Sequence, residues 1–162
     1  MKIYRRTLTY IMGKAFWHTY PGAYITVNYQ LSNSMYCDID NMEVTEEMLE
    51  KVKAKMQEII EQDLKIEKRT MTRKEAGKFF NHTNTSKGRL QFDVEEKQDI
   101  NMYYCDDYFN YIYETIATHT GITKVFDLQK YSKGFLLRYP STQDVNNLPE
   151  FTETKKLLWA LQ

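Results

Sequence analysis

Apolar side chains in the first part of the chain recur every three or four positions in two stretches. The first stretch covers residues 4–19, after which Tyr20-Pro21-Gly22 ends the pattern. The second follows Thr45, where two glutamates take the positions that favour acidic side chains at a helix N-terminus. The spacing therefore predicts one helix over residues 4–19 and a second from Thr45 to about residue 62.

Alternating apolar and polar residues predict two β-hairpins. Residues 24–29 and 35–39 alternate on either side of the turn Ser32-Asn33-Ser34. Residues 123–131 and 135–139 face each other across Ser132-Lys133-Gly134 in the same way. Four strands are expected from these two hairpins.

The middle of the chain gives weaker patterns. Residues 64–71 alternate and predict a short, half-exposed strand, which leads into a third helix that begins at the capping box Thr72-Arg73-Lys74-Glu75. Residues 81–97 are polar and weakly periodic, with one more short helix expected around residues 86–93. The tyrosine-rich residues 100–113 are expected to form sheet.

Length and composition suit one globular domain. The chain has 162 residues, of which 42% are hydrophobic, and only three prolines and six glycines. We expect residues 1–140 to form an α+β domain in which an antiparallel sheet is covered by the first two helices. Leu148-Pro149 opens a last helix, so residues 141–162 are expected to form a helical linker. The first helix has no capping residue in front of it and the last has no stop signal, so we expect a piece of a larger protein.

Charge and hydropathy narrow the function classes. The 22 basic and 22 acidic residues balance, so no overall positive field attracts nucleic acid or a membrane surface. The sequence contains neither a run of about 20 apolar residues nor a signal-peptide pattern, and we expect a cytoplasmic protein without membrane contact. Thirteen tyrosines favour a strand-rich fold or a surface that meets a partner.

Nucleotide-binding and metal motifs are not evident. The glycines are scattered, and neither a P-loop nor a dinucleotide fingerprint is present. Cys37 and Cys105 lie 68 positions apart, which favours two buried free thiols over a metal knuckle or a disulfide. His18 suits a role at a helix end or an interface. His119 suits a hydrogen-bonding loop residue better than a catalytic base, and His82 also stands alone.

Two further groups of residues invite a chemical interpretation. Asp38 with Asp40, and the adjacent Asp106-Asp107, are candidate carboxylate pairs, but strand ends and turns commonly carry aspartate for structural reasons. The tyrosines of residues 103–113 are able to stack on bases, yet their acidic neighbours oppose a phosphate backbone. Packing in a core or an interface is the preferred interpretation of these tyrosines.

Several motifs in the first forty residues resemble the second additional domain of threonyl-tRNA synthetases. These are Arg6-Thr7-Leu8-Thr9-Tyr10, Tyr20-Pro21-Gly22 with the strand that follows, and Tyr36-Cys37-Asp38-Ile39-Asp40. In the synthetases, and in the related alanyl enzymes, this domain edits mischarged tRNA. The resemblance therefore implies an editing-domain fold.

The editing residues of that family are replaced in this chain. The family motif His-x-x-x-His falls on Arg6 and Tyr10, and the Cys and His of the motif Cys-x-x-x-His fall on Ile112 and Ile116. An arginine, a phenol and two isoleucines cannot supply the metal ligands or proton carriers that two imidazoles and a thiolate supply near neutral pH. We therefore expect no editing chemistry and no catalytic or metal-binding residue.

A second resemblance covers most of the chain. The order of motifs is similar to the middle domain of bacterial uridine-kinase-like proteins, which join a TGS domain, a synthetase-like domain and a C-terminal P-loop kinase. The motifs are Met56-Gln57-Glu58-Ile59-Ile60, Thr120-Gly121 leading to Phe126-Asp127-Leu128, and Gly134-Phe135-Leu136-Leu137-Arg138, with those above. The resemblance implies that ATP and magnesium belong to the kinase domain and that this fragment has no cofactor.

The function expected from the sequence is that of a non-catalytic accessory domain of a nucleoside kinase. Its partners would be the TGS and kinase domains, with a nucleoside or tRNA as open ligands. The expected pocket residues are Arg6, Tyr10, Asp38 and Tyr104, with Arg6 able to hold an anion by two hydrogen bonds or only to pair with a nearby acid. The alternatives are a hydrolase that edits mischarged tRNA through a relocated metal, and a module that binds RNA or protein.

Overall fold

Two antiparallel sheets and two long helices form the part of the chain that the structure describes. The computed structural model describes residues 2–31, 33–72, 100–112 and 114–149. The helices are α1 (Lys2–Thr19) and α2 (Glu46–Glu61), with the short 3₁₀ helix η2 (Thr120–Ile122). The predicted α+β class is confirmed.

The strands divide between a four-stranded and a three-stranded sheet. The larger sheet has the order β1 (Ile25–Leu31), β2 (Ser34–Ile39), β7 (Gly134–Arg138), β6 (Asp127–Tyr131). The smaller sheet has the order β3 (Glu67–Met71), β4 (Ile100–Cys105), β5 (Tyr108–Tyr111). Both predicted hairpins are present, as β1–β2 and β6–β7. Helices α1 and α2 pack on the larger sheet, and β3, β4 and β5 form a second sheet in which they pair only with one another among the described strands.

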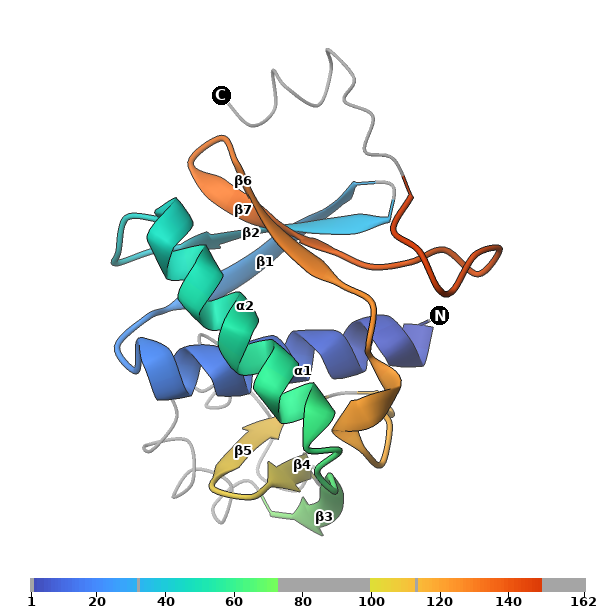
Figure 1. Cartoon of the computed structure of the whole chain (residues 1–162). Coiled ribbons are helices and arrows are strands. Elements are labelled where there is room, and N and C mark those ends of the chain that lie inside the picture. Colours follow the sequence, from blue (N-terminus) through green and yellow to red (C-terminus); the bar gives the residue numbers. More distant parts are fainter. Residues whose placement is uncertain (1, 32, 73–99, 113, 150–162) are drawn as a thin grey trace.

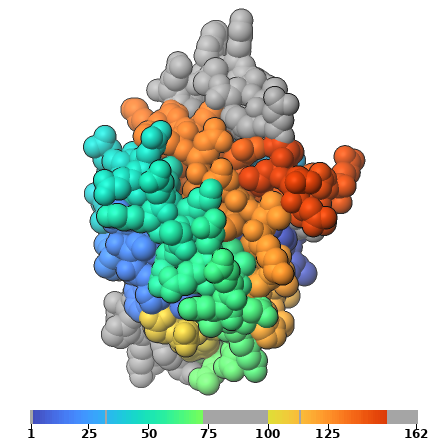
Figure 2. Space-filling model, viewed as in Figure 1, coloured from blue at the N-terminus to red at the C-terminus, as the bar shows by residue number. Residues whose placement is uncertain are grey.

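Helix α1 lies between the two sheets, and α2 crosses it (Figure 1). The main core lies where α1 and α2 pack on one face of the larger sheet. It includes Leu8, Met12 and Phe16 from α1, Val52 and Met56 from α2, and Cys37, Phe135 and Leu137 from the sheet. The opposite side of α1 presents Tyr10 to a second cluster, in which it packs on the smaller sheet. Viewed from the same direction, α2 and residues 120–149 form much of the molecular surface (Figure 2).

Local sequence signals explain where α2 begins and where the hairpins turn. Thr45 takes an extended backbone, and its Oγ1 accepts a hydrogen bond of 3.1 Å from the N–H of Met48, which satisfies one of the free donors of the first turn. Asp106 and Ser132 have positive φ angles of 59° and 53° in the two-residue turns β4–β5 and β6–β7. Such turns need left-handed residues because their twist then matches that of the strands.

Other expectations fall on parts of the chain that differ or lie outside the description. Residues 141–149 form turns and bends, so the described part of the expected linker is not helical. The third helix, the segment 81–97 and the C-terminal helix lie outside the described residues. Among the described residues, no helix is long and apolar enough to cross a membrane.

Candidate functional site

A cavity of about 560 Å³ lies between α1 and β1. We call it the α1–β1 cavity. Its surface is mostly apolar, although polar and charged side chains make up about half of its lining residues. Its lining residues are Arg5, Arg6, Thr9, Tyr10, Met12, Gly13, Ile25, Thr26, Val27, Asn28, Tyr29, Gln30, Met35, Asn110 and Ile112. A concave, mostly apolar site with a few polar groups has the character of a small-molecule pocket.

The four positions that the synthetase resemblance assigns to editing residues come together beside this cavity. Arg6 and Tyr10 line it from α1, and Ile112 lines it from the end of β5. Ile116 packs with Tyr10 and Ile112 in one buried cluster. The fold thus brings together two segments separated by more than 100 positions, in the way that a composite site requires.

Arg6 already forms contacts with neighbouring groups of the protein. It forms an ion pair with Glu114 and donates a hydrogen bond of 3.4 Å to the carbonyl of Thr115. Beside it, the buried Thr7 Oγ1 accepts a hydrogen bond of 2.9 Å from the N–H of Ala117. These contacts attach α1 to the segment that follows β5, and Arg6 is structural as well as cavity-lining.

Tyr10 is a buried, neutral phenol. Its hydroxyl is 2.9 Å from the carbonyl oxygen of Tyr103 and 3.3 Å from that of Tyr108, so it donates to the smaller sheet. Burial, followed by the charges of Tyr108 and Cys105, raises the pKa of Tyr10 far above its usual value. A phenol held in this way is neither a base nor a metal ligand near neutral pH.

Asp38 and Tyr104 do not line the cavity, unlike the other two predicted pocket residues. Asp38 pairs with Thr26 on the face of β2 opposite Cys37, where its Oδ2 accepts a hydrogen bond of 3.0 Å from Asn28. Tyr104 packs against Phe109, with the guanidinium of Arg69 5.1 Å from its ring centre. The physical reason is strand alternation, which turns consecutive side chains to opposite faces.

Both cysteines are free and buried, as predicted. Burial, followed by the charge of Asp38, raises the pKa of the Cys37 thiol to about 12. Burial is also the main cause that raises the pKa of Cys105, while Lys14 partly opposes it. Neither thiol is ionised near neutral pH, so neither is an activated nucleophile.

Lys14 is a buried lysine that the sequence pattern alone does not single out. Lys14 is 3% exposed, and its Nζ donates to the carbonyl of Cys105 at 3.1 Å and to Asp107 Oδ1 at 2.9 Å. His18 Nε2 lies 3.1 Å from the same carboxylate oxygen, so His18 has a contact near the helix end. The available signal was the position of Lys14 three residues after Ile11 and one before Ala15, on the apolar side of α1.

The other residues that the sequence suggested for chemistry make local structural contacts. Asp106 and Asp107 form the β4–β5 turn, and Thr26 donates weakly to Asp40 at 3.3 Å. His119 Nδ1 lies 3.1 Å from the hydroxyl of Thr118, in a loop that bridges to Lys65. Within the described ranges, no group of three His, Cys, Asp or Glu side chains is arranged to hold a metal ion.

Thr120 is a fully buried polar residue near the cavity-side cluster's Ile116 in sequence. Its hydroxyl donates to the carbonyl of Ile59 at 2.7 Å and accepts from the N–H of Leu64 at 2.9 Å. It therefore connects η2 to the end of α2.

Comparison with known proteins agrees with this fold. No family model matches the chain. The threonine–tRNA ligase of Acetivibrio thermocellus is 31% identical over 82% of this chain and 21% of its own length. The enzyme of Symbiobacterium thermophilum is 32% identical over 78% and 20%, and that of Fusobacterium nucleatum is 28% identical over 78% and 21%.

The chain is therefore an α+β domain similar to one segment of threonine–tRNA ligases. It spans about a fifth of the length of the curated relatives it matches. These relatives support the expected likeness to a threonyl-tRNA synthetase domain. None of these three carries the name of a kinase, so they do not support the expected kinase context.

Proposed function

We propose that this chain is an editing-domain-like module that binds a small ligand in the α1–β1 cavity and does not hydrolyse aminoacyl-tRNA. One observation carries the proposal. The four positions assigned to the editing residues lie beside a cavity, but they are filled by Arg6, Tyr10, Ile112 and Ile116. The scaffold of the site is retained while its reactive groups are replaced.

The chemistry of these side chains supports binding without hydrolysis. Removal of an amino acid from tRNA needs a group that activates water, and in proteins such groups are imidazoles, carboxylates or metal-bound hydroxide. The Tyr10 hydroxyl is already a donor to the backbone of the smaller sheet. Ile112 and Ile116 have no polar atom, and Arg6 is paired with Glu114. The cavity keeps amide groups from Asn28, Gln30 and Asn110 that can orient a ligand.

Ligand binding is tested by a thermal-shift screen of nucleosides, nucleotides, amino acids and tRNA, because a ligand of the folded state raises the melting temperature. The variant Val27→Trp places a large ring in the cavity and should abolish the shift caused by any hit. Val27 is 38% exposed, and a strand accepts tryptophan readily. The matched control is Ile122→Trp, at an exposed apolar residue outside the cavity lining. A hit that Val27→Trp leaves unchanged would place the ligand elsewhere.

The second candidate is a hydrolase that acts through a relocated metal, and the similarity to threonine–tRNA ligases favours it. Elemental analysis for zinc and a deacylation assay on mischarged tRNA separate the two. Stoichiometric zinc with deacylation would establish the hydrolase and overturn the proposal. Turnover at the level of a no-protein control, together with a ligand in the screen, would support it.

We also propose that the module works inside a larger cytoplasmic protein in which TGS and P-loop kinase domains flank it. What supports this is the order of the motifs from Arg6 to Arg138 described above. In that setting the kinase would phosphorylate uridine or a related nucleoside, and the module would sense a ligand or position the kinase. The sequence that precedes and follows residues 1–162 in the full-length protein tests this directly.

A further inference from the structure

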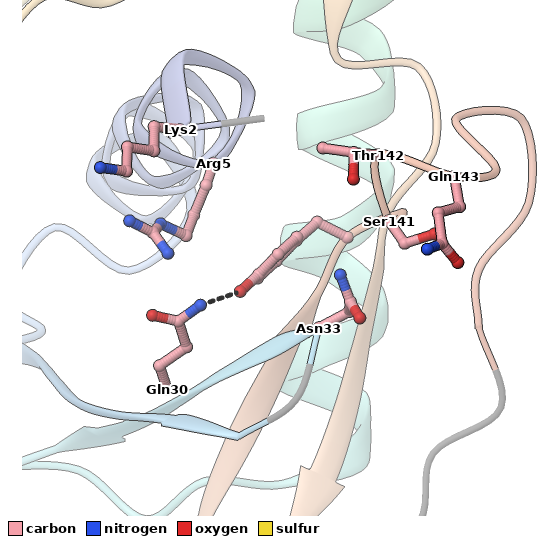
Figure 3. A pocket seen from close by; sticks show the side chains of 8 residues that line it. Lys2, Arg5, Gln30, Asn33, Ser141, Thr142 and Gln143 are labelled. Atoms are coloured by element: carbon pink, nitrogen blue, oxygen red, sulfur yellow. Dashed lines mark hydrogen bonds between the residues drawn. The ribbon is translucent and has the colours of Figure 1, made fainter.

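A second cavity, of about 380 Å³, opens at the first turns of α1. Its lining residues are Lys2, Arg5, Gln30, Asn33, Tyr139, Ser141, Thr142 and Gln143. Figure 3 shows that they come from α1, from both sides of the β1–β2 turn and from the segment after β7. We call it the Arg5 cavity. Among the residues that the structure describes, its lining contains hydrogen-bonding side chains throughout and no carboxylate.

The charge of this cavity is unbalanced. Lys2 and Arg5 contribute two positive charges, and within the described residues neither takes part in an ion pair. The cations elsewhere on α1 are used differently, since Arg6 pairs with Glu114 and Lys14 with Asp107. In a chain with equal numbers of acidic and basic residues, a hollow lined by cations and neutral donors alone is suited to an anion.

The buried hydroxyl of Tyr139 also lies at the Arg5 cavity. Tyr139 is 2% exposed, and its oxygen accepts a hydrogen bond of 3.0 Å from Gln30 Nε2, marked by the dashed line in Figure 3. Acceptance from Gln30 leaves the hydroxyl hydrogen of Tyr139 to donate, because a phenol both donates and accepts. In Figure 3 the side chain of Arg5 extends from α1 toward Gln30. Guanidinium, amide and phenol donors therefore converge from three elements.

The Arg5 cavity adjoins the α1–β1 cavity. Arg5 and Gln30 line both of them. The two hollows differ in character, because the larger one is lined largely by apolar groups, including Ile25, Val27 and Met35. A molecule with a compact anionic end and an apolar or aromatic body would fill both.

We propose that the Arg5 cavity binds the phosphate group of a small phosphomonoester whose organic part enters the α1–β1 cavity. The phosphate site stands on the Arg5 cavity alone, whereas the placement of the organic part rests on the proposed function. Arginine matches the planar pair of oxygens that a phosphate presents, and hydrogen bonds between charged groups are stronger than those between neutral ones.

Titration calorimetry with inorganic phosphate tests the phosphate site on the folded chain. Arg5→Gln should weaken binding about tenfold to a hundredfold, the range expected for loss of a charged hydrogen-bonding partner. The matched control Lys133→Gln removes the same charge from the exposed β6–β7 turn and should leave the affinity unchanged. Tyr139→Phe is a second variant, which should weaken binding by a smaller factor. Absence of phosphate binding, or equal loss in Arg5→Gln and Lys133→Gln, would overturn the site.

Phenyl phosphate and glucose 6-phosphate then test the organic part. The aromatic ester should bind more tightly than inorganic phosphate and than the sugar ester, because the adjoining cavity is largely apolar. Val27→Trp should remove this advantage and leave the affinity for inorganic phosphate intact. If phenyl phosphate binds no more tightly than inorganic phosphate, or if Val27→Trp leaves its affinity unchanged, the organic part does not enter the α1–β1 cavity. The phosphate site itself would still stand.

Discussion

Two cationic residues of α1, Arg5 and Lys14, lie in opposite environments. The described residues that line the hollow beside Arg5 include no acid, whereas Lys14 is buried and its charge is met by Asp107, a carboxylate that is itself half exposed. A buried ammonium group is tolerated only when its hydrogen bonds are satisfied, and Lys14 satisfies two of them on the smaller sheet. A cation of α1 therefore serves stability at Lys14, whereas Arg5 forms no ion pair with the described residues and can meet a ligand.

Replacement of Lys14 by methionine should measure the structural role. Lys14→Met keeps the apolar stem but leaves the carbonyl of Cys105 without this donor, so we expect a loss of about 1–3 kcal/mol in the free energy of unfolding. Urea denaturation provides the value. Lys51→Met on the exposed face of α2 is the control and should change stability by less than about 0.5 kcal/mol. A neutral result at Lys14 would show that the buried contacts contribute nothing.

The carboxylate of Asp107 should make stability sensitive to acid. Burial acts to raise its pKa, but the hydrogen bond and charge of Lys14 and the charge of His18 outweigh burial, so the pKa lies below its ordinary value of 3.8. A carboxyl group with a depressed folded pKa stabilises the protein above its unfolded pKa and loses that effect as the pH falls through the folded value.

The comparison of the parent with Asp107→Asn isolates this effect. Their difference in the free energy of unfolding should be present at pH 5 and shrink as the pH falls below about 4. Because Asp107 is half exposed, the difference should be small. A difference that is unchanged down to pH 2 would contradict the role of its charge.

Periodicity explains how far single residues were predictable from the sequence. It placed Arg6 and Tyr10 on one helix, where both line the α1–β1 cavity. Periodicity could not predict that Asp38 and Tyr104 lie away from the cavity. Which face of a strand packs against a helix depends on the packing of the whole sheet rather than on the strand's own residues. Lys14 was missed because a lysine in an apolar stripe looks like an ordinary exception until its partner, from a turn 93 positions away, is known.

At the scale of elements, the capping contact of α2 gives a direct test. Thr45→Ala removes the hydroxyl that accepts from the N–H of Met48 and should lower stability by about 1 kcal/mol. Thr45→Ser keeps the hydroxyl and should stay close to the parent. Thermal unfolding followed by circular dichroism measures both, and equal losses in the two variants would point to the methyl group instead of the cap.

The pairing of β2 with β7 depends on a glycine. A Cβ at Gly134 would overlap the carbonyl oxygen of Cys37 and would lie 2.9 Å from the hydroxyl of Tyr36, so Gly134→Ala should cost about 1–3 kcal/mol. At Gly22 a Cβ would meet only the end of Met42 at 3.4 Å, which makes Gly22→Ala the matched control with a much smaller effect. Both are compared by urea denaturation, and similar values for the two would refute the steric argument.

The existence and type of α1, α2 and the strands of the two hairpins of the larger sheet were predictable, whereas the assembly of the elements was not. Thr45, Tyr20-Pro21-Gly22 and the turn at Ser132 mark boundaries by local chemistry, and the structure has elements at those places. The division into two sheets has no local cause. It follows from long-range pairing, with β3 beside β4 and β2 beside β7, and a strand pattern does not name its partner.

For the whole molecule, α1 is the element that joins the two sheets. Its residues Leu8, Met12 and Phe16 belong to the main core, while Tyr10 belongs to the cluster on the smaller sheet. Bulk apolar packing holds the first side, and specific hydrogen bonds from Tyr10 and Lys14 hold the second. The candidate cavity lies beside this junction, so the position of the smaller sheet sets its shape.

Removal of the Tyr10 hydroxyl should therefore loosen one sheet more than the other. Tyr10→Phe keeps the ring contact with Tyr108, whose centroid is 5.2 Å away, but deletes the hydrogen bond to the carbonyl of Tyr103. We expect a global loss of about 1 kcal/mol, together with faster amide hydrogen exchange in β4 and β5 than in β1 and β2. Equal acceleration in both sheets would mean that they open as one unit, and that α1 does not form the separable joint that these contacts indicate.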